Sequence, residues 1–300
     1  MKRTGRELNA IFSVAEEMVK NNGEDCLYHD VDGDNFIIAS FDGCGGSGSK
    51  KYENYSGKTG AYMASRAVCG GVRAWFYESK EEDSIKEYIK KSLSTLKEYG
   101  GGAGRIMGSL GKAFPTTVAA IYGEAEGKTL EATCFWAGDS RCYLLDETGL
   151  HQLTEDDLDG QDAMSNLVND GIMTNVVNAS TDFEVHKKKL AIDGPCILLT
   201  ATDGCFGYLK SPMAFEYLLT DTLVKAENLS EWKVLLNERM YEVTGDDYTL
   251  CAAVYGFDSF DKIKDSFEKR NSFVEKEYID TEEDVNLLWD RYKKEYSLYL

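Results

Sequence analysis

Proline is scarce in this sequence, with 3 residues in 300, and no low-complexity linker is present. Nothing therefore marks an internal domain boundary before about residue 257. No run of about 18 apolar residues occurs, the length that a membrane-spanning helix needs, and residues 1–7 do not lead into an uninterrupted apolar segment. We predict neither a signal peptide nor a membrane span, and we expect a cytoplasmic protein.

Basic residues are also fewer than acidic residues. The chain has 33 basic and 52 acidic residues and a net charge of -19. This balance argues against nucleic acid as a partner and fits a protein that holds cations. No two of the eight cysteines have the Cys-x-x-Cys spacing of a zinc or redox motif, and Cys134, Cys196 and Cys251 lie in apolar, strand-like runs. We therefore expect reduced cysteines in the core.

The middle of the chain favours strands. Segments rich in β-branched, aromatic and cysteine residues alternate with short turns, and such short connections cannot cross over to a parallel neighbour. They predict an antiparallel meander of strands at residues 116–123, 129–137, 141–145 and 150–154. Further strands are expected at residues 183–185, from Cys196, and at 248–255.

Helical spacing of apolar residues predicts amphipathic helices at residues 57–77 and 83–98. Ser211 and Ser230 are predicted caps of two later helices. Residues 8–19 fit a helix, although residues 10–15 could equally form a short strand, and both interpretations remain open. Because strands and helices come in blocks, the sequence predicts an α+β fold in layers.

Residues 258–300 form a charged, helical tail that follows a domain at residues 1–257. Its first helix carries an apolar stripe, and a capping-box-like segment at residues 281–284 opens a second helix. Aromatic residues near the end predict that the tail packs on the domain. A partner or dimer contact is the alternative, because exposed aromatic side chains mark interfaces. These aromatics are Trp289, Tyr292, Tyr296 and Tyr299.

Two apolar runs end in the same way. Residues 36–41 lead into Asp42-Gly43, and the run from Cys196 leads into Asp203-Gly204. One Asp-Gly pair is typical of a tight turn, but its repetition after two strands indicates a site. Other carboxylates at strand ends or in tight turns are Glu24, Asp25, Asp139, Asp246 and Asp247.

Carboxylates gathered at the edge of a core repel one another and lose hydration, so they require a compensating cation. Oxygen ligands without a His or Cys motif favour Mg²⁺ or Mn²⁺ over zinc. When one aspartate bridges two such ions, about 3.5 to 4 Å apart, the site generates a hydroxide and holds a phosphoryl group for in-line displacement.

Seven short motifs carry these residues: Glu24-Asp25-Cys26, Asp42-Gly43-Cys44-Gly45-Gly46, Pro115-Thr116-Thr117, Ala137-Gly138-Asp139-Ser140-Arg141-Cys142-Tyr143-Leu144, Gln152-Leu153-Thr154-Glu155-Asp156, Thr202-Asp203-Gly204 and Asp246-Asp247-Tyr248-Thr249. Their order and spacing over about residues 10–257 resemble the metal-dependent protein phosphatases, the type 2C serine/threonine phosphatase family, in its bacterial form. The resemblance implies an antiparallel β-sandwich flanked by helices on both faces, with the C-terminal helical tail as an addition.

The resemblance also implies an activity. A metal-bridging hydroxide would attack phosphoserine or phosphothreonine of a protein substrate directly, without a phosphoenzyme. Two Mn²⁺ or Mg²⁺ ions are expected, with a weaker third site. By similarity, Asp42, Asp203 and Asp246 are the main catalytic ligands, Asp42 bridging the ions with the Gly43 carbonyl as a further ligand. Glu24 and Asp25 support the second ion, and Asp139 with Asp203 forms the third site.

Several positions depart from the family's pattern. Lys20 stands where the family has a phosphate-binding arginine, which keeps the charge but loses the bidentate fork. Cys44 replaces a histidine that some members have as a proposed general acid, and Asp157 replaces another histidine. The segment at residues 158–189, where the family has its flap, looks short. These departures leave a second hypothesis, a pseudophosphatase that acts as a regulatory binding module.

Overall fold

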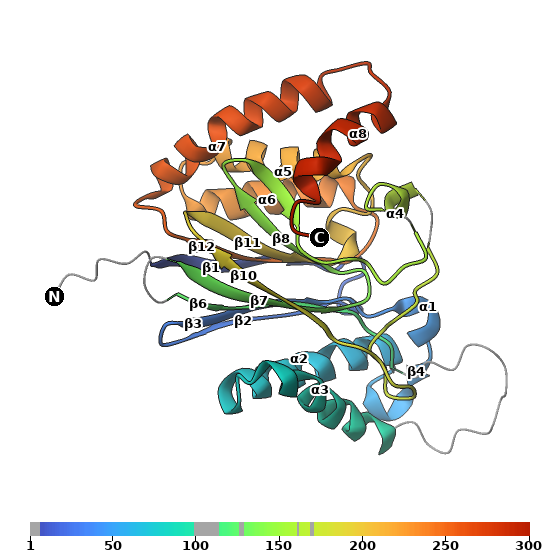
Figure 1. Ribbon diagram of the computed structural model, residues 1–300. Helices are drawn as coiled ribbons and strands as arrows, with labels where there is room; N and C mark the ends of the chain where they lie inside the picture. The colour runs from blue at the N-terminus through green and yellow to red at the C-terminus, as the bar shows by residue number, and fades with distance from the viewer. Residues whose placement is uncertain (1–6, 99–113, 126–128, 161, 169–170) are drawn as a thin grey trace.

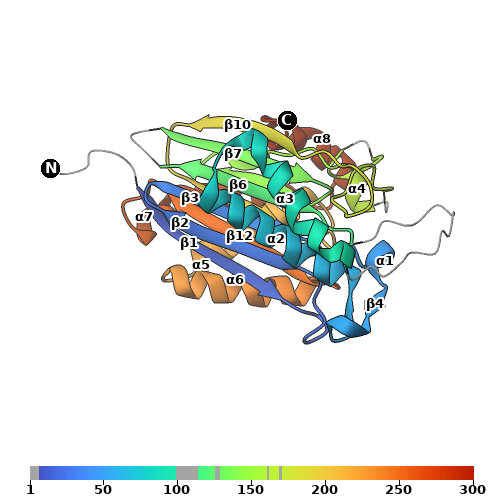
Figure 2. The same cartoon turned by 90° about the horizontal axis from the view of Figure 1, so that it is seen from below.

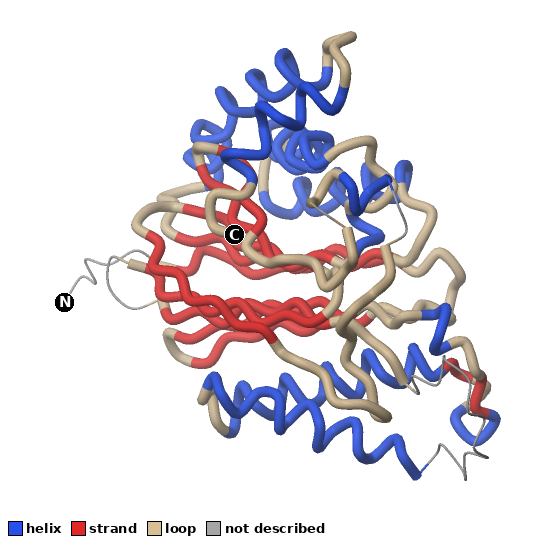
Figure 3. Tube along the Cα trace, turned by 45° about the vertical axis from the view of Figure 1, so that its right-hand side comes forward, coloured by secondary structure: helices blue, strands red, loops and turns tan. Residues whose placement is uncertain are grey.

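Two antiparallel β-sheets lie face to face, and helices cover both outer faces of the pair (Figure 1 and Figure 3). The computed structural model describes residues 7–98, 114–125, 129–160, 162–168 and 171–300. The predicted α+β sandwich is confirmed. The first sheet contains, in spatial order, β1 (Leu8–Glu16), β12 (Tyr248–Tyr255), β11 (Cys196–Ala201), β8 (Arg141–Asp146) and β9 (Gly149–Gln152). The second contains β10 (His186–Ile192), β7 (Leu130–Ala137), β6 (Val118–Glu124), β3 (Asn35–Phe41) and β2 (Cys26–Asp32).

The helices form the two outer layers. On the second sheet lie α2 (Gly60–Glu78) and α3 (Ile85–Ser94), seen from below in Figure 2. On the first sheet lie α5 (Pro212–Lys225) and α6 (Leu229–Val243), with α7 (Phe260–Val274) packed on α5 and α8 (Val285–Tyr296) packed against β9 and α5. Short elements are α1 (Gly45–Gly48), α4 (Ser165–Val168), β4 (Lys51–Tyr52) and β5 (Lys58–Thr59). Among the described residues, no helix has both the length and the apolar character needed to cross a membrane.

The predicted four-strand meander was wrong, because its strands are divided between the two sheets. β6 pairs with β7 in the second sheet, and β8 pairs with β9 in the first. The chain crosses between the sheets at residues 138–140, where Gly138 has a φ of +96°, a conformation that favours glycine. The crossing leaves Asp139 at one end of the sandwich.

The open question at residues 8–19 is resolved in favour of a strand, β1. Phe12 and Val14 are buried two residues apart, the period of a strand that packs one face on a core. β1 pairs antiparallel with β12, a central strand in which all eight residues are buried. The strand expected at residues 183–185 was wrong in position, because β10 begins at His186.

Helix caps were predicted with mixed success. Ser211 caps α5, as expected from the Ser-Pro pair. Asn228 rather than Ser230 caps α6, and its side chain accepts the capping hydrogen bond at 3.0 Å. Asp284 caps α8 at 2.9 Å, so the capping box expected to begin at Thr281 was wrong. Polar side chains capable of capping stand close together at both places, and the sequence does not distinguish among them.

The C-terminal tail packs on the body of the protein. Trp289, Tyr292 and Tyr296 are buried in the core on the outer side of the first sheet. A partner surface through these aromatics therefore has no support, since its premise was their exposure. The domain boundary after residue 257 stays a prediction.

A buried ion pair fastens the tail to α5. Glu216 is fully buried and accepts hydrogen bonds from Arg270 of α7, at 2.6 Å and 3.1 Å, and from the hydroxyl of Tyr292 of α8. Arg270 also donates to Glu295 at 3.0 Å. One carboxylate therefore joins three helices, and its removal would leave a buried guanidinium without its main partner.

We predict that Glu216→Gln lowers the free energy of unfolding by about 3 kcal/mol, because breaking one side of a buried ion pair leaves an uncompensated charge. Chemical denaturation measures the change. Glu268→Gln is the matched control on the exposed side of α7 and should change stability by less than about 0.5 kcal/mol. Equal effects of the two substitutions would contradict the role given to Glu216.

His151 of β9 forms a second link to the tail. Its Nδ1 donates to the carbonyl of Glu295 at 2.6 Å, and its Nε2 lies 3.3 Å from a carboxylate oxygen of Asp146. Burial lowers the pKa of His151, but the hydrogen bonds to Asp146 and to the Glu295 carbonyl outweigh burial and raise the pKa above its usual value. The folded state therefore favours the imidazolium form.

A group whose pKa is raised by folding stabilises the protein fully below its unfolded pKa and loses that contribution as pH rises through its folded pKa. The stability difference between the wild type and His151→Gln should therefore shrink as pH rises above about 6.5. Urea denaturation of both proteins between pH 6 and pH 9 measures it. A difference that stays constant across this range would contradict the link.

Candidate metal centre

The strand register of the second sheet places two predicted site residues side by side. Cys26 at the start of β2 pairs with Phe41 at the end of β3. Asp25 immediately precedes β2 and Asp42 immediately follows β3, so the two carboxylates belong to the same end of the sheet.

The first sheet contributes two more carboxylates at its corresponding end. Ala201 pairs with Leu250, so the end of β11 lies beside the start of β12. Asp203 follows β11, and Asp246 precedes β12. A buried hydrogen bond of 2.9 Å between the hydroxyls of Ser40 and Thr200 joins the sheets close to these ends. The two pairs of carboxylates therefore meet.

Asp42 is held through its backbone. Its carbonyl accepts hydrogen bonds from the hydroxyl of Thr116 at 2.6 Å and from the amide of Thr117 at 2.8 Å, and its own amide donates to the Thr117 hydroxyl at 3.0 Å. The Asp42 carboxylate accepts no hydrogen bond from the described residues. Three backbone bonds thus fix the residue and leave its side chain available.

Gly43 occupies a position that admits no side chain. A Cβ there would lie 2.7 Å from the carbonyl oxygen of Glu24 and 2.9 Å from that of Ala61. The backbones of the Asp42 loop, the Glu24 segment and α2 therefore approach one another closely. Only glycine allows this close approach, which places Glu24 next to the Asp42 loop.

Glu24 and Asp25 are oriented by groups from distant parts of the chain. The Glu24 amide donates to a carboxylate oxygen of Asp247 at 2.8 Å, and the Glu24 side chain accepts a hydrogen bond from Thr59. The Thr202 hydroxyl donates to Asp25 at 2.8 Å. Asp247 also accepts from the amide of Met18 at 2.9 Å, so one carboxylate fixes both sides of the β1–β2 connection.

Asp139 carries the clearest sign of a missing partner. Its Oδ1 is buried and accepts no hydrogen bond within the described part of the chain. Asp139 and Asp203 line a cavity of about 280 Å³, together with the buried ion pair between Arg141 and Asp156. Asp246 is more exposed than these residues.

Electrostatics at this end of the sandwich strongly favour a cation. Burial raises the pKa of Asp25 to about 8, and the charge of Asp203 adds to the effect. Burial likewise raises the pKa of Asp139 to about 8 and that of Asp203 to about 6, with neighbouring carboxylates as further causes. The pKa of Asp42 is raised well above its usual value by burial and by the charges of Asp203, Asp25, Asp139 and Asp246. Glu24 and Asp246 also have raised pKa values, mainly through burial.

In their present positions, no three His, Cys, Asp or Glu side chains of the described residues enclose a metal ion. The donor set nevertheless fits one. It consists of oxygens, one of them buried without a partner, and hard divalent cations such as Mg²⁺ and Mn²⁺ prefer such ligands. The roles of these residues as ligands remain predictions.

Lys20 lines a different cavity from Asp139 and Asp203. It is exposed in the loop after β1 and lines a cavity of about 640 Å³ next to Asp25. Its predicted role in binding phosphate also remains a prediction.

Asp157, a departure from the family's pattern, has a clear structural task. Its carboxylate accepts hydrogen bonds from the Gly138 amide at 2.9 Å and from Asn175 at 2.7 Å, and it lies 2.9 Å from Nε2 of His186. It thereby ties the loop that carries Asp139 to the segment before β10.

Sequence reasoning gave no role to three contributors: Asp247, Thr202 and Arg66, whose Nη1 donates to the Glu24 carbonyl at 2.9 Å. Asp247 was recognised only as a neighbour of Asp246, and its place in an Asp-Asp pair was the one available signal. Thr202 was part of the motif around Asp203, but the motif did not indicate its hydrogen bond to Asp25. Arg66 lies within α2, and its spacing among the helical residues gave no indication of a site.

We predict that Gly43→Ala lowers the free energy of unfolding by about 2 kcal/mol, because the added methyl group collides with two carbonyl oxygens. Gly46→Ala is the matched control, since a Cβ there meets no atom within 4 Å. It should leave stability unchanged or slightly higher. Chemical denaturation of both variants distinguishes them, and equal stabilities would contradict the close approach at Gly43.

No protein-family model matches this chain, and no curated protein sequence does. Solved structures do match. The serine/threonine phosphatase Stp1 from Staphylococcus aureus is 16% identical, with a TM-score of 0.60 over 85% of this chain and 97% of that one. The PPM Ser-Thr phosphatase MsPP from Mycobacterium smegmatis is 14% identical, with a TM-score of 0.56 over 83% of this chain and 98% of that one.

A further match is the catalytic domain of the serine threonine protein phosphatase PstP in complex with two manganese ions. It is 16% identical, with a TM-score of 0.53 over 83% of this chain and 98% of that one. Identities this low establish likeness of fold. The chain therefore has the fold of the bacterial PPM serine/threonine phosphatases, as its resemblance to the type 2C family predicted.

Proposed function

We propose that this protein is a Mn²⁺- or Mg²⁺-dependent phosphatase that hydrolyses phosphoserine and phosphothreonine in proteins. The observation that carries the proposal is the convergence of Asp25, Asp42, Asp139 and Asp203 at one end of the sandwich, with Asp139 Oδ1 buried and unpartnered. The shared fold and the two manganese ions of one structural neighbour support it.

The proposed ligands are those that the resemblance to the type 2C family implies. Asp42, Asp203 and Asp246 would hold one ion, and Asp42 with the support of Glu24 and Asp25, partly through water, would hold a second. The Gly43 carbonyl would be a ligand of one of the two ions. Asp139 and Asp203 would hold a weaker third. Ions bound there would activate water as a nucleophile and neutralise the charge of the phosphoryl group.

The chain's own contribution is preorganisation. Thr116 and Thr117 fix the backbone of Asp42, and Thr202 orients Asp25. Asp247 holds the amide of Glu24 in place. Because these bonds are present before substrate arrives, the carboxylates need little rearrangement during the reaction.

We predict Mn²⁺-dependent hydrolysis of p-nitrophenyl phosphate and of a phosphothreonine peptide. Asp203→Asn should lower kcat by at least about a hundredfold, the usual loss when a main electrostatic contributor is removed. Asp258→Asn, an exposed aspartate after β12, is the matched control and should retain full activity.

Thermal unfolding separates metal binding from catalysis. Mn²⁺ at about 100 times its Kd should stabilise the wild type by about 2.7 kcal/mol and should stabilise Asp203→Asn much less. Stabilisation without hydrolysis would contradict the enzyme and favour the binding module. Absence of both effects would contradict the metal centre itself.

A further inference from the structure

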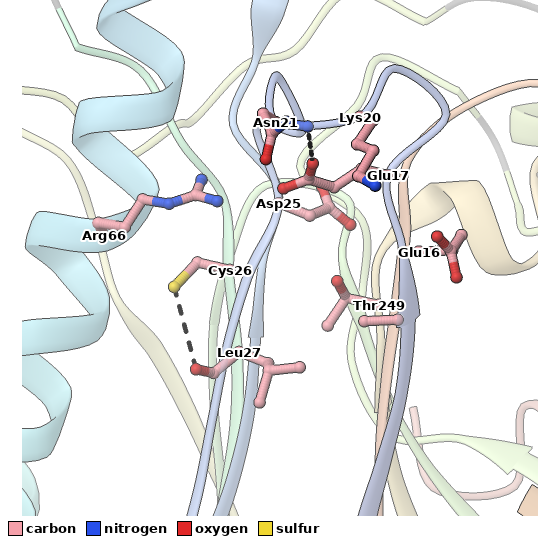
Figure 4. A pocket seen from close by; sticks show the side chains of 10 residues that line it. Glu16, Glu17, Lys20, Asn21, Asp25, Cys26, Leu27, Arg66 and Thr249 are labelled. Atoms are coloured by element: carbon pink, nitrogen blue, oxygen red, sulfur yellow. Dashed lines mark hydrogen bonds between the residues drawn. The ribbon is translucent and has the colours of Figure 1, made fainter. Parts of the chain in front are cut away.

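A cavity of about 640 Å³ lies beside Asp25, between the ends of β1 and β2 (Figure 4). Two cations line it, Lys20 from the loop after β1 and Arg66 from α2. Figure 4 shows Arg66 reaching from its helix toward the strand that carries Asp25 and Cys26. Three carboxylates, Glu16, Glu17 and Asp25, also line the cavity, so an anionic ligand there would have to be held by specific contacts with Lys20 or Arg66.

The guanidinium of Arg66 is held in a defined orientation. Its Nη1 donates to the carbonyl oxygen of Glu24 at 2.9 Å and to the hydroxyl of Ser65 at 3.0 Å. Its central carbon lies 3.7 Å from the centre of the Tyr62 ring, so the ring supports the charged group from one side. Lys58 lies over the same ring at 4.5 Å and adds a third positive charge nearby.

This orientation leaves donors available on the other edge of the guanidinium. Within the described part of the chain, Nε and Nη2 of Arg66 donate no hydrogen bond. These two nitrogens form the fork that matches two oxygens of a phosphate group. Lys20, by contrast, offers a compact charge on a flexible stem from an exposed loop.

We infer that Arg66 binds the phosphoryl oxygens of a phosphoserine or phosphothreonine substrate in this cavity, and thus takes the task that resemblance alone would give to Lys20. The inference rests on the proposed function for its substrate class. The guanidinium approaches the centre from α2, and it is anchored by the same Glu24 segment that the carboxylate cluster uses. Substrate phosphate and candidate metal ligands would therefore be aligned by one stretch of backbone.

Binding of a phosphothreonine peptide and of the same peptide without phosphate (the control peptide) tests the inference separately from catalysis. Calorimetry in the presence of Mn²⁺ would use the full wild-type chain, with the phosphate ester of the phosphopeptide replaced by a non-hydrolysable phosphonate so that no turnover occurs. Arg66→Ala should weaken binding of the phosphopeptide by about ten- to a hundredfold, as expected for charge-assisted hydrogen bonds. It should leave the affinity of the control peptide unchanged. Arg73→Ala, an exposed arginine on the same helix, is the matched control and should stay within about twofold.

Arg66→Lys keeps the positive charge and one donor for the Glu24 carbonyl but removes the paired donors Nε and Nη2. This variant tests the inference if Arg66→Ala does not fold. It should also lose at least about tenfold in phosphopeptide affinity. Undiminished phosphopeptide binding by the folded Arg66 variants, equal losses for both peptides, or no preference of the wild type for the phosphopeptide would each overturn the inference. If the wild type lacks hydrolysis while binding still depends on Arg66, the proposed function fails and the inference stands.

Discussion

Repulsion among carboxyl groups gathered at one end of the sandwich is the constraint on which the surrounding structure depends. Burial and neighbouring negative charges raise the pKa values of Asp42, Asp25 and Asp139 together, and the charge of Asp203 contributes to all three shifts. The protein opposes this repulsion with backbone geometry. Thr116 and Thr117 fix the Asp42 loop, and the hydrogen bond from the Glu24 amide to Asp247 holds the Glu24 segment, which Gly43 allows to approach that loop closely.

Much of this arrangement could be predicted from the sequence, because its signals are local. Asp42 and Asp203 stand immediately after apolar runs, so each strand and its terminal carboxylate were recognisable together. Order and spacing of the motifs then gave the sandwich. The division of β7 and β8 between two sheets was not predictable in this way, since short turns join strands within a sheet and between sheets equally well. It depends on the conformation of Gly138, which the sequence does not specify.

Contacts between distant residues account for the other failures. The bond from Glu24 to Asp247 spans 223 residues, and no spacing rule relates the two positions. Arg66 lies within α2, where the spacing of apolar residues indicates only which face of the helix is buried. The tail illustrates the same limit: its aromatic residues predicted packing, but the carboxylate of Glu216 that receives Arg270 could be recognised only in the folded protein.

The two hydrogen bonds that Asp247 accepts have a consequence for the order in which parts of the protein fold. Asp247 binds the amides of Met18 and Glu24, and the next strand, β12, fills the space between β1 and β11 in the first sheet. Contacts of such long sequence separation form late and slowly. During synthesis, the candidate centre therefore cannot assemble until β12 has emerged from the ribosome, more than 200 residues after Glu24. A nascent chain that already contains Asp42 and Asp203 still lacks Asp247, whose hydrogen bond to the Glu24 amide holds Glu24 in place.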